Sequence, residues 1–66
     1  MNQPKHIIGT WTCPSGNSVD AIRQGEGLDL TFRWDVGPPI PPEDRGYYLR
    51  VILPQAIVKV LVLLPT

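Results

Sequence analysis

Residues 28–36, LDLTFRWDV, alternate strictly between apolar and polar side chains. The apolar residues occupy the even positions, and the polar or charged residues occupy the odd positions. Because successive side chains of a strand point to opposite faces, this period of two predicts a strand with one buried and one solvated face. A chain with such a strand must build a sheet and cover one side of it.

Two further strands are expected nearer the N-terminus. Residues 6–13, HIIGTWTC, are typical of a strand, and residues 14–17, PSGN, are typical of a turn. Residues 18–24, SVDAIRQ, leave two alternatives open. Ser18 could cap a short helix that stops at Gly25, but a strand is favoured because of the loop that follows.

That loop, GEG at 25–27, resembles a three-residue hairpin connection with glycine in the left-handed conformation. It would join the two neighbouring segments as an antiparallel hairpin. In this register, Arg23 lies opposite Asp29 and Ile22 lies opposite Leu30.

The C-terminal third is expected to add two strands. Residues 47–53, YYLRVIL, are rich in aromatic and β-branched side chains, which favour strands. Pro54 could open a helix at its first position, but β-branched side chains in residues 55–64, QAIVKVLVLL, favour a strand. A helix there would be apolar on all sides, and we expect so small a domain to be unable to surround it. A strand with both faces apolar except at Lys59 would be central in the sheet or covered by a second chain.

These segments predict an all-β fold. Four or five short antiparallel strands would form a meander that curls into a barrel or half-sandwich of SH3-like size. The chain of 66 residues makes a single small β-domain, residues 1–66. A chain this short is marginally stable, and its one cysteine, Cys13, excludes a disulfide within the chain. Stability must then come from a well-packed core or from self-association.

Charge and motif content argue against catalysis and against general nucleic-acid binding. Six basic residues balance six acidic ones, and a neutral chain is a poor binder of nucleic-acid phosphates. His6 and Cys13 are the one pair that suggests thiol or metal chemistry, but they have opposite strand parity and lie far apart along the chain. The glycines form no phosphate-binding motif. We therefore expect no enzyme, no cofactor and no metal site.

The apolar segments are short for a membrane protein. The longest, AIVKVLVLL at 56–64, has nine residues with a lysine inside it, whereas a spanning helix needs about 20. The N-terminal residues contain no apolar run of signal-peptide length. We expect a cytoplasmic protein without membrane contact.

One basic and aromatic grouping leaves a nucleic-acid alternative open. Arg33, Tyr48 and Arg50 would lie on the outer face of the predicted strands, where aromatic stacking and arginine contacts can hold a single strand. Tyr48 is the aromatic residue that is hardest to bury in the predicted sheet. The alternative function is a small barrel that binds single-stranded nucleic acid.

A proline-rich loop, GPPIPPEDRG at 37–46, separates the predicted strands. Its prolines favour the extended polyproline II form and contain two overlapping PxxP spacings. Such segments dock into aromatic-lined grooves of partner proteins, although a stiff connection is the alternative role. The candidate partner-contact residues are Pro38, Pro39, Ile40, Pro41, Pro42 and Arg45.

The C-terminal apolar segment is the second candidate surface. It offers more apolar side chains than a four-stranded sheet covers, and large apolar patches mark interfaces. Strand addition between two copies would cover both faces and the edge of this segment. The leading hypothesis is a non-enzymatic domain that binds protein and forms a homodimer. The predicted self-association residues are Ile57, Val58, Val60, Leu61 and Leu63.

Overall fold

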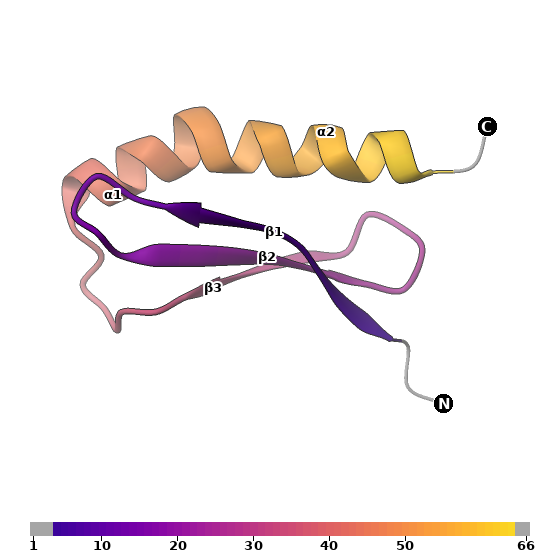
Figure 1. The fold of residues 1–66 in the computed structure, drawn as a ribbon, viewed down its shortest axis with the longest axis horizontal. Coiled ribbons are helices and arrows are strands. Elements are labelled where there is room, and N and C mark those ends of the chain that lie inside the picture. The colour runs from indigo at the N-terminus through magenta and orange to yellow at the C-terminus, as the bar shows by residue number, and fades with distance from the viewer. Residues whose placement is uncertain (1–3, 65–66) are drawn as a thin grey trace.

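The computed structural model describes residues 4–64 and contains a three-stranded antiparallel sheet with one long helix packed on it (Figure 1). The strands lie in the order β1-β2-β3. Their bounds are β1, Lys5–Thr12; β2, Ser18–Gln24; and β3, Leu30–Trp34.

The helix follows the sheet in the chain and runs without interruption from Pro42 to Leu63. It has three parts that differ in hydrogen bonding. They are α1, Pro42–Tyr47; a π-helical turn η1, Tyr48–Ile52; and α2, Leu53–Leu63.

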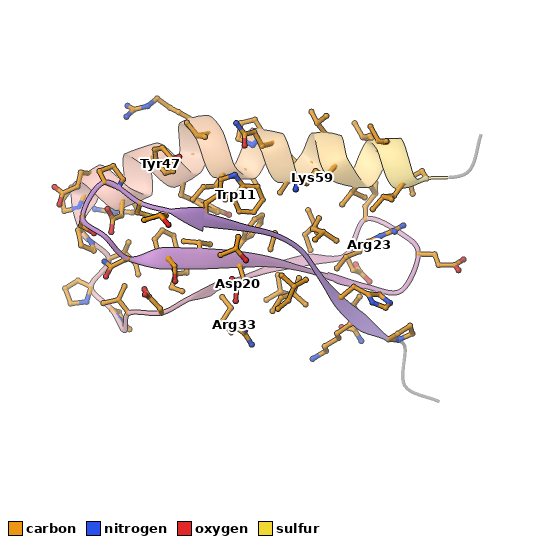
Figure 2. All side chains as sticks on the ribbon, in the orientation of Figure 1. Trp11, Asp20, Arg23, Arg33, Tyr47 and Lys59 are labelled. Carbon is orange, nitrogen blue, oxygen red and sulfur yellow. The ribbon has the colours of Figure 1, made fainter. Side chains whose placement is uncertain are left out.

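The core forms between the helix and one face of the sheet. Val19 of the central strand β2 and Ile52 of η1 are fully buried, and Cys13, just after β1, lies in the same cluster. Aromatic rings from β1, β3 and the first half of the helix close this cluster, and Figure 2 labels two of them. These rings are Trp11, Phe32, Trp34, Tyr47 and Tyr48.

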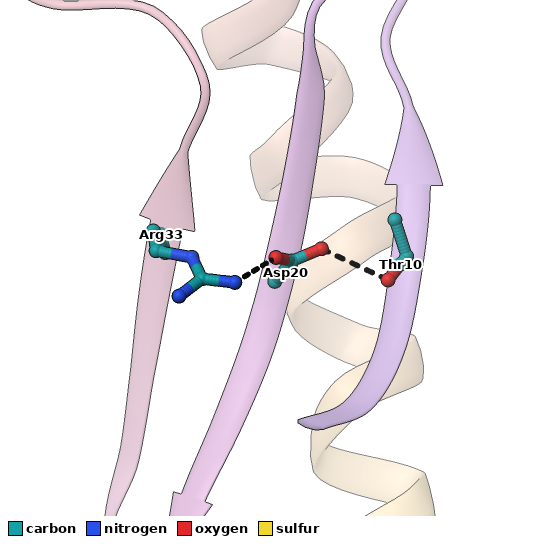
Figure 3. A network of polar contacts seen from close by, with 3 residues as sticks. All are labelled: Thr10, Asp20 and Arg33. Carbon is teal, nitrogen blue, oxygen red and sulfur yellow. Dashed lines mark hydrogen bonds and ion pairs between the residues drawn. The ribbon is translucent and has the colours of Figure 1, made fainter. Parts of the chain in front are cut away.

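The other face of the sheet is open and carries a polar row across all three strands (Figure 3). Asp20 of β2 accepts hydrogen bonds from Arg33 Nη2 of β3 at 2.7 Å and from Thr10 Oγ1 of β1 at 2.9 Å. The hydrogen bond from Arg33, followed by that from Thr10, lowers the pKa of Asp20. The helix lies behind the sheet in this view, so the row is on the side that the helix does not cover.

The helix forms because its buried residues follow a helical spacing. Ile52, Ala56 and Val60 are four residues apart and fully buried, which places them on one side of a helix. Proline is tolerated in the first turn, where Pro42 stands, because the N–H it lacks would have no partner there. The acidic residues of this turn also suit the positive end of the helix dipole.

The π-helical turn lies directly before Pro54. A proline inside an α-helix removes one N–H donor, and its ring clashes with the carbonyl group four residues earlier. At the end of η1, the N–H of Leu53 bonds to the carbonyl oxygen of Tyr48, five residues back. This wider turn lets the helix continue past Pro54.

The predicted all-β fold is wrong, and so are its two C-terminal strands. Residues 47–53 and 55–64 belong to the helix. The fold is mixed α/β, with an open sheet of three strands and not a barrel or half-sandwich of four or five. The prediction relied on the local preference of β-branched residues and on the premise that every side of an apolar helix must be covered. The helix instead buries one side and exposes the other.

The three strands predicted nearer the N-terminus are confirmed. The strand predicted at 6–13 is β1, Lys5–Thr12, and the one predicted at 28–36 is β3, Leu30–Trp34, whereas β2 has the predicted bounds of 18–24. For residues 18–24, the strand is therefore correct and the alternative short helix is wrong. The predicted turn at 14–17 is also present.

The predicted pairing of β2 with β3 is wrong by one residue. Arg23 pairs with Leu30 and not with Asp29. The predicted register would have placed Asp20 opposite Phe32 on the buried face, and burying an unpaired carboxylate is costly. A loop one residue longer keeps Asp20 on the open face, since a one-residue shift moves side chains from one face to the other.

Gly9 allows the ring of Trp11 to lie against the backbone of β1. A Cβ atom on Gly9 would be 2.6 Å from Cη2 of Trp11 and 3.2 Å from Nζ of Lys59. In this position, Nε1 of Trp11 donates a hydrogen bond to Oε1 of Gln55 in α2 at 2.9 Å. Gly9 therefore makes room for one of the contacts that connect β1 with the helix.

We expect Gly9→Ala to lower the free energy of unfolding by about 1–3 kcal/mol, because the Trp11 ring must move away from Gln55. Gly27→Ala is the matched control, since a Cβ atom on Gly27 meets no atom within 4 Å. Urea unfolding followed by circular dichroism measures both values. A Gly9→Ala variant as stable as Gly27→Ala would contradict this role.

Candidate functional site

The side of α2 that faces away from the sheet is apolar and exposed. Ile57, Val58, Leu61 and Val62 each leave between 43% and 78% of their surface open to solvent. Residues three and four apart are neighbours on a helix, so the four form one stripe, which we call the α2 outer face. Contiguous apolar patches of this kind mark binding surfaces more often than isolated apolar residues do.

Lys59, the only charged residue of α2, bends away from the outer face (Figure 2). Its Nζ donates a hydrogen bond to the carbonyl oxygen of Ile8 at 3.0 Å and lies 5.6 Å from the centre of the Trp11 ring. Ile8 is the extra residue of a bulge, because the register of β1 shifts between Ile7 and Gly9. The contact leaves the outer face without a charged group.

A shallow groove of about 400 Å³ lies between α2 and β1. A second hollow, of about 360 Å³, adjoins it and extends toward the first turn of α2. Both are open to solvent, and the first is lined almost wholly by apolar atoms. Its lining residues are Ile8, Val58, Lys59, Val62 and Leu63.

The predicted self-association residues separate into two groups. Val60 is fully buried against the sheet. The other four are exposed on a helix, so strand addition or exchange through this segment is wrong. Val62, with 78% of its surface exposed, is missing from the predicted set. The exposed members are Ile57, Val58, Leu61 and Leu63.

The proline-rich loop only partly resembles the predicted docking segment. Its first two prolines and Arg45 are exposed, whereas Ile40 and Pro41 are half-buried. Residues 38 and 39 lie in a bend and Pro42 is the first residue of α1, so the predicted extended form does not run through the four prolines. The overlapping PxxP spacings do not share one polyproline helix, and the role of this loop in binding a partner stays a prediction.

The three residues of the nucleic-acid alternative do not share a surface. The ring of Tyr48 packs edge-on against Phe32, with ring centres 5.0 Å apart, and against Trp34 at 5.7 Å. Burial raises the pKa of Tyr48. Arg33 alternates with these rings along β3 and therefore lies on the open face of the sheet, whereas Arg50 is exposed on the helix.

Cys13 and His6 are not brought together. Cys13 is buried, and burial, followed by the negative charges of Asp44 and Asp35, raises the pKa of its thiol. A raised pKa disfavours the reactive thiolate. His6 is exposed near the other end of β1, and residues 4–64 contain no cluster of three potential metal ligands.

Asp44 is the polar residue that sequence reasoning missed. It is fully buried at the start of the helix, where it accepts hydrogen bonds from the backbone N–H of Ser15 at 3.2 Å and from Nδ2 of Asn17 at 2.9 Å. The hydroxyl group of Ser15 donates a third. Burial raises the pKa of Asp44, but these hydrogen bonds outweigh it and leave the pKa below its usual value. The carboxylate fastens the turn after β1 to the helix.

The continuous helix Pro42–Leu63 has 22 residues and is long and apolar enough to cross a membrane, judged by length and composition only. The local sequence pattern does not predict this length, because the aromatic and β-branched residues of 47–53 favour a strand. A scan against known protein families finds no match, and searches of curated proteins and of solved structures find none either.

We expect the buried Asp44 carboxylate to make stability depend on pH. Its pKa is lower in the folded than in the unfolded chain, where it is about 3.9. The stabilisation is therefore complete above about pH 4 and is lost as the pH falls through the folded pKa. Asp44→Asn should lower stability at neutral pH and remove this part of the acid dependence.

Urea unfolding of the wild type and of Asp44→Asn between neutral and acidic pH measures both effects. Glu43→Gln is the matched control, because Glu43 is exposed in the same helical turn. Equal stability losses in the two variants at neutral pH would contradict the fastening role of Asp44.

Proposed function

We propose that this protein is a small non-enzymatic binding domain that pairs with a second copy of itself through the α2 outer face. The observation that carries the proposal is the absence of charge from this exposed apolar stripe, because Lys59 is bound back to the carbonyl oxygen of Ile8. A surface without charge is not repelled by a second copy of itself. Closed two-fold dimers are the commonest assemblies formed by self-complementary surfaces.

The size of the stripe predicts a weak dimer. Its four side chains are between 43% and 78% exposed, and completing the burial of each contributes about 1 kcal/mol. Two copies together gain about 8 kcal/mol, against an association cost of about 4–15 kcal/mol. We therefore expect pairing to depend strongly on protein concentration.

Membrane attachment is the second candidate function, because the helix Pro42–Leu63 has the length and composition of a spanning helix. Spanning would require the helix to leave the sheet, which would expose Val19 and break the contacts of Asp44. These costs favour pairing over insertion.

We expect Leu61→Asp to abolish pairing, because a dimer would bury two carboxylates without partners. Leu28→Asp is the matched control, since Leu28 in the β2–β3 loop is 64% exposed and Leu61 is 54% exposed. Sedimentation equilibrium over a concentration series should give an association constant at least tenfold lower for Leu61→Asp than for the control.

Two results would contradict the proposal. One is a wild-type chain that stays a 7.4 kDa monomer at the highest concentration reached. The other is an equal effect of Leu28→Asp. Flotation with phosphatidylcholine vesicles tests the second candidate: binding by the monomeric wild type but not by Leu61→Asp would support membrane attachment.

A further inference from the structure

The groove between Ile8 and α2 combines an apolar lining with a single cation. Val58, Val62 and Leu63 line it from the helix, and Ile8 lines it from β1. With the adjoining hollow, it follows α2 from Pro54 to Leu63, a length of roughly 13 Å at the rise of an α-helix. An extended medium-length acyl chain has about this length.

The cation of the groove is the ammonium group of Lys59, which is positioned but not neutralised. An ammonium group has three N–H donors, and the carbonyl oxygen of Ile8 accepts from one of them. The ring of Trp11 lies on another side. Within residues 4–64, Lys59 has no carboxylate partner, since the one ion pair there joins Arg33 to Asp20.

We propose that the groove binds a single-chain carboxylate amphiphile, such as the anion of a medium-chain fatty acid. The carboxylate accepts hydrogen bonds from the free donors of Lys59, and the chain lies along Val58, Val62 and Leu63. The apolar lining selects the chain, and the lone ammonium group selects the negative head. The site shares Val58 and Val62 with the α2 outer face but does not depend on pairing.

The test uses the Leu61→Asp variant. Residue 61 does not line the groove, and the variant stays monomeric if pairing uses the α2 outer face as proposed. Sodium decanoate is titrated into the labelled variant, below its micelle concentration, and amide and methyl NMR shifts are recorded. We expect saturable shifts at Ile8, Val58, Lys59, Val62 and Leu63. Decyltrimethylammonium, which has the same chain with a positive head, should bind about fivefold more weakly.

Variants of Lys59 and of the apolar lining distinguish the contribution of the carboxylate head group to binding from that of the acyl chain. Lys59→Gln should remove the preference for decanoate over decyltrimethylammonium, whereas Lys59→Arg should keep it. In the Leu61→Asp background, which already prevents pairing, Val62→Asp should weaken decanoate binding, while Ile57→Asp, on the other flank of α2, should leave it unchanged. An unaltered spectrum away from the groove verifies the fold of each variant.

Several outcomes would overturn the assignment. They are an absence of saturable shifts, equal affinity for both head groups, and shifts that spread over Leu49 and Ile57. Binding to phosphatidylglycerol vesicles without binding to free decanoate would identify a membrane surface instead. A monomeric wild type that binds decanoate would refute the proposed dimer and leave the groove site standing.

Discussion

A three-stranded sheet can cover only one side of one helix, and this helix is longer than the strands beneath it. Strands of five to eight residues extend roughly 17–27 Å. The helix of 22 residues extends roughly 33 Å. The sheet covers one row of helix side chains, from Ile52 to Val60, and the remaining apolar surface of the helix stays exposed to solvent. Both the α2 outer face and the groove beside it follow from this mismatch.

Polar contacts with β1 and the turn after it determine which side of the helix is left uncovered. The turn holds Asp44 at the helix start, Trp11 bonds to Gln55, and the bulge in β1 receives Lys59. Each contact draws a polar side chain of the helix toward the sheet. The rotation that satisfies these groups is therefore the one that leaves the outer face apolar and without charge.

The sheet could be predicted from the sequence because alternation in residues 28–36 directly reports which side chains meet water. The helix could not, since burial of Ile52 and Val60 depends on distant strands and no local pattern in an apolar run identifies the buried row. Pro42 followed by two acidic residues is a local signal of the helix start, and Pro54 is a second proline at a position that suits the first turn of a helix. Exposed apolar residues in the C-terminal segment could be predicted whether it forms a strand or a helix. The segment has more apolar side chains than so small a domain can cover. The position of Lys59 depends on a bulge in β1, which the sequence does not indicate.

The two proposed binding events are coupled, because each needs Val58 and Val62. A chain lying in the groove covers side chains that a second copy would contact, so each event weakens the other. This coupling is reciprocal: the factor by which an amphiphile lowers the pairing constant equals the factor by which pairing lowers affinity for the amphiphile. Since the proposed dimer is weak, even a modest ligand affinity would be enough to shift the balance toward the monomer.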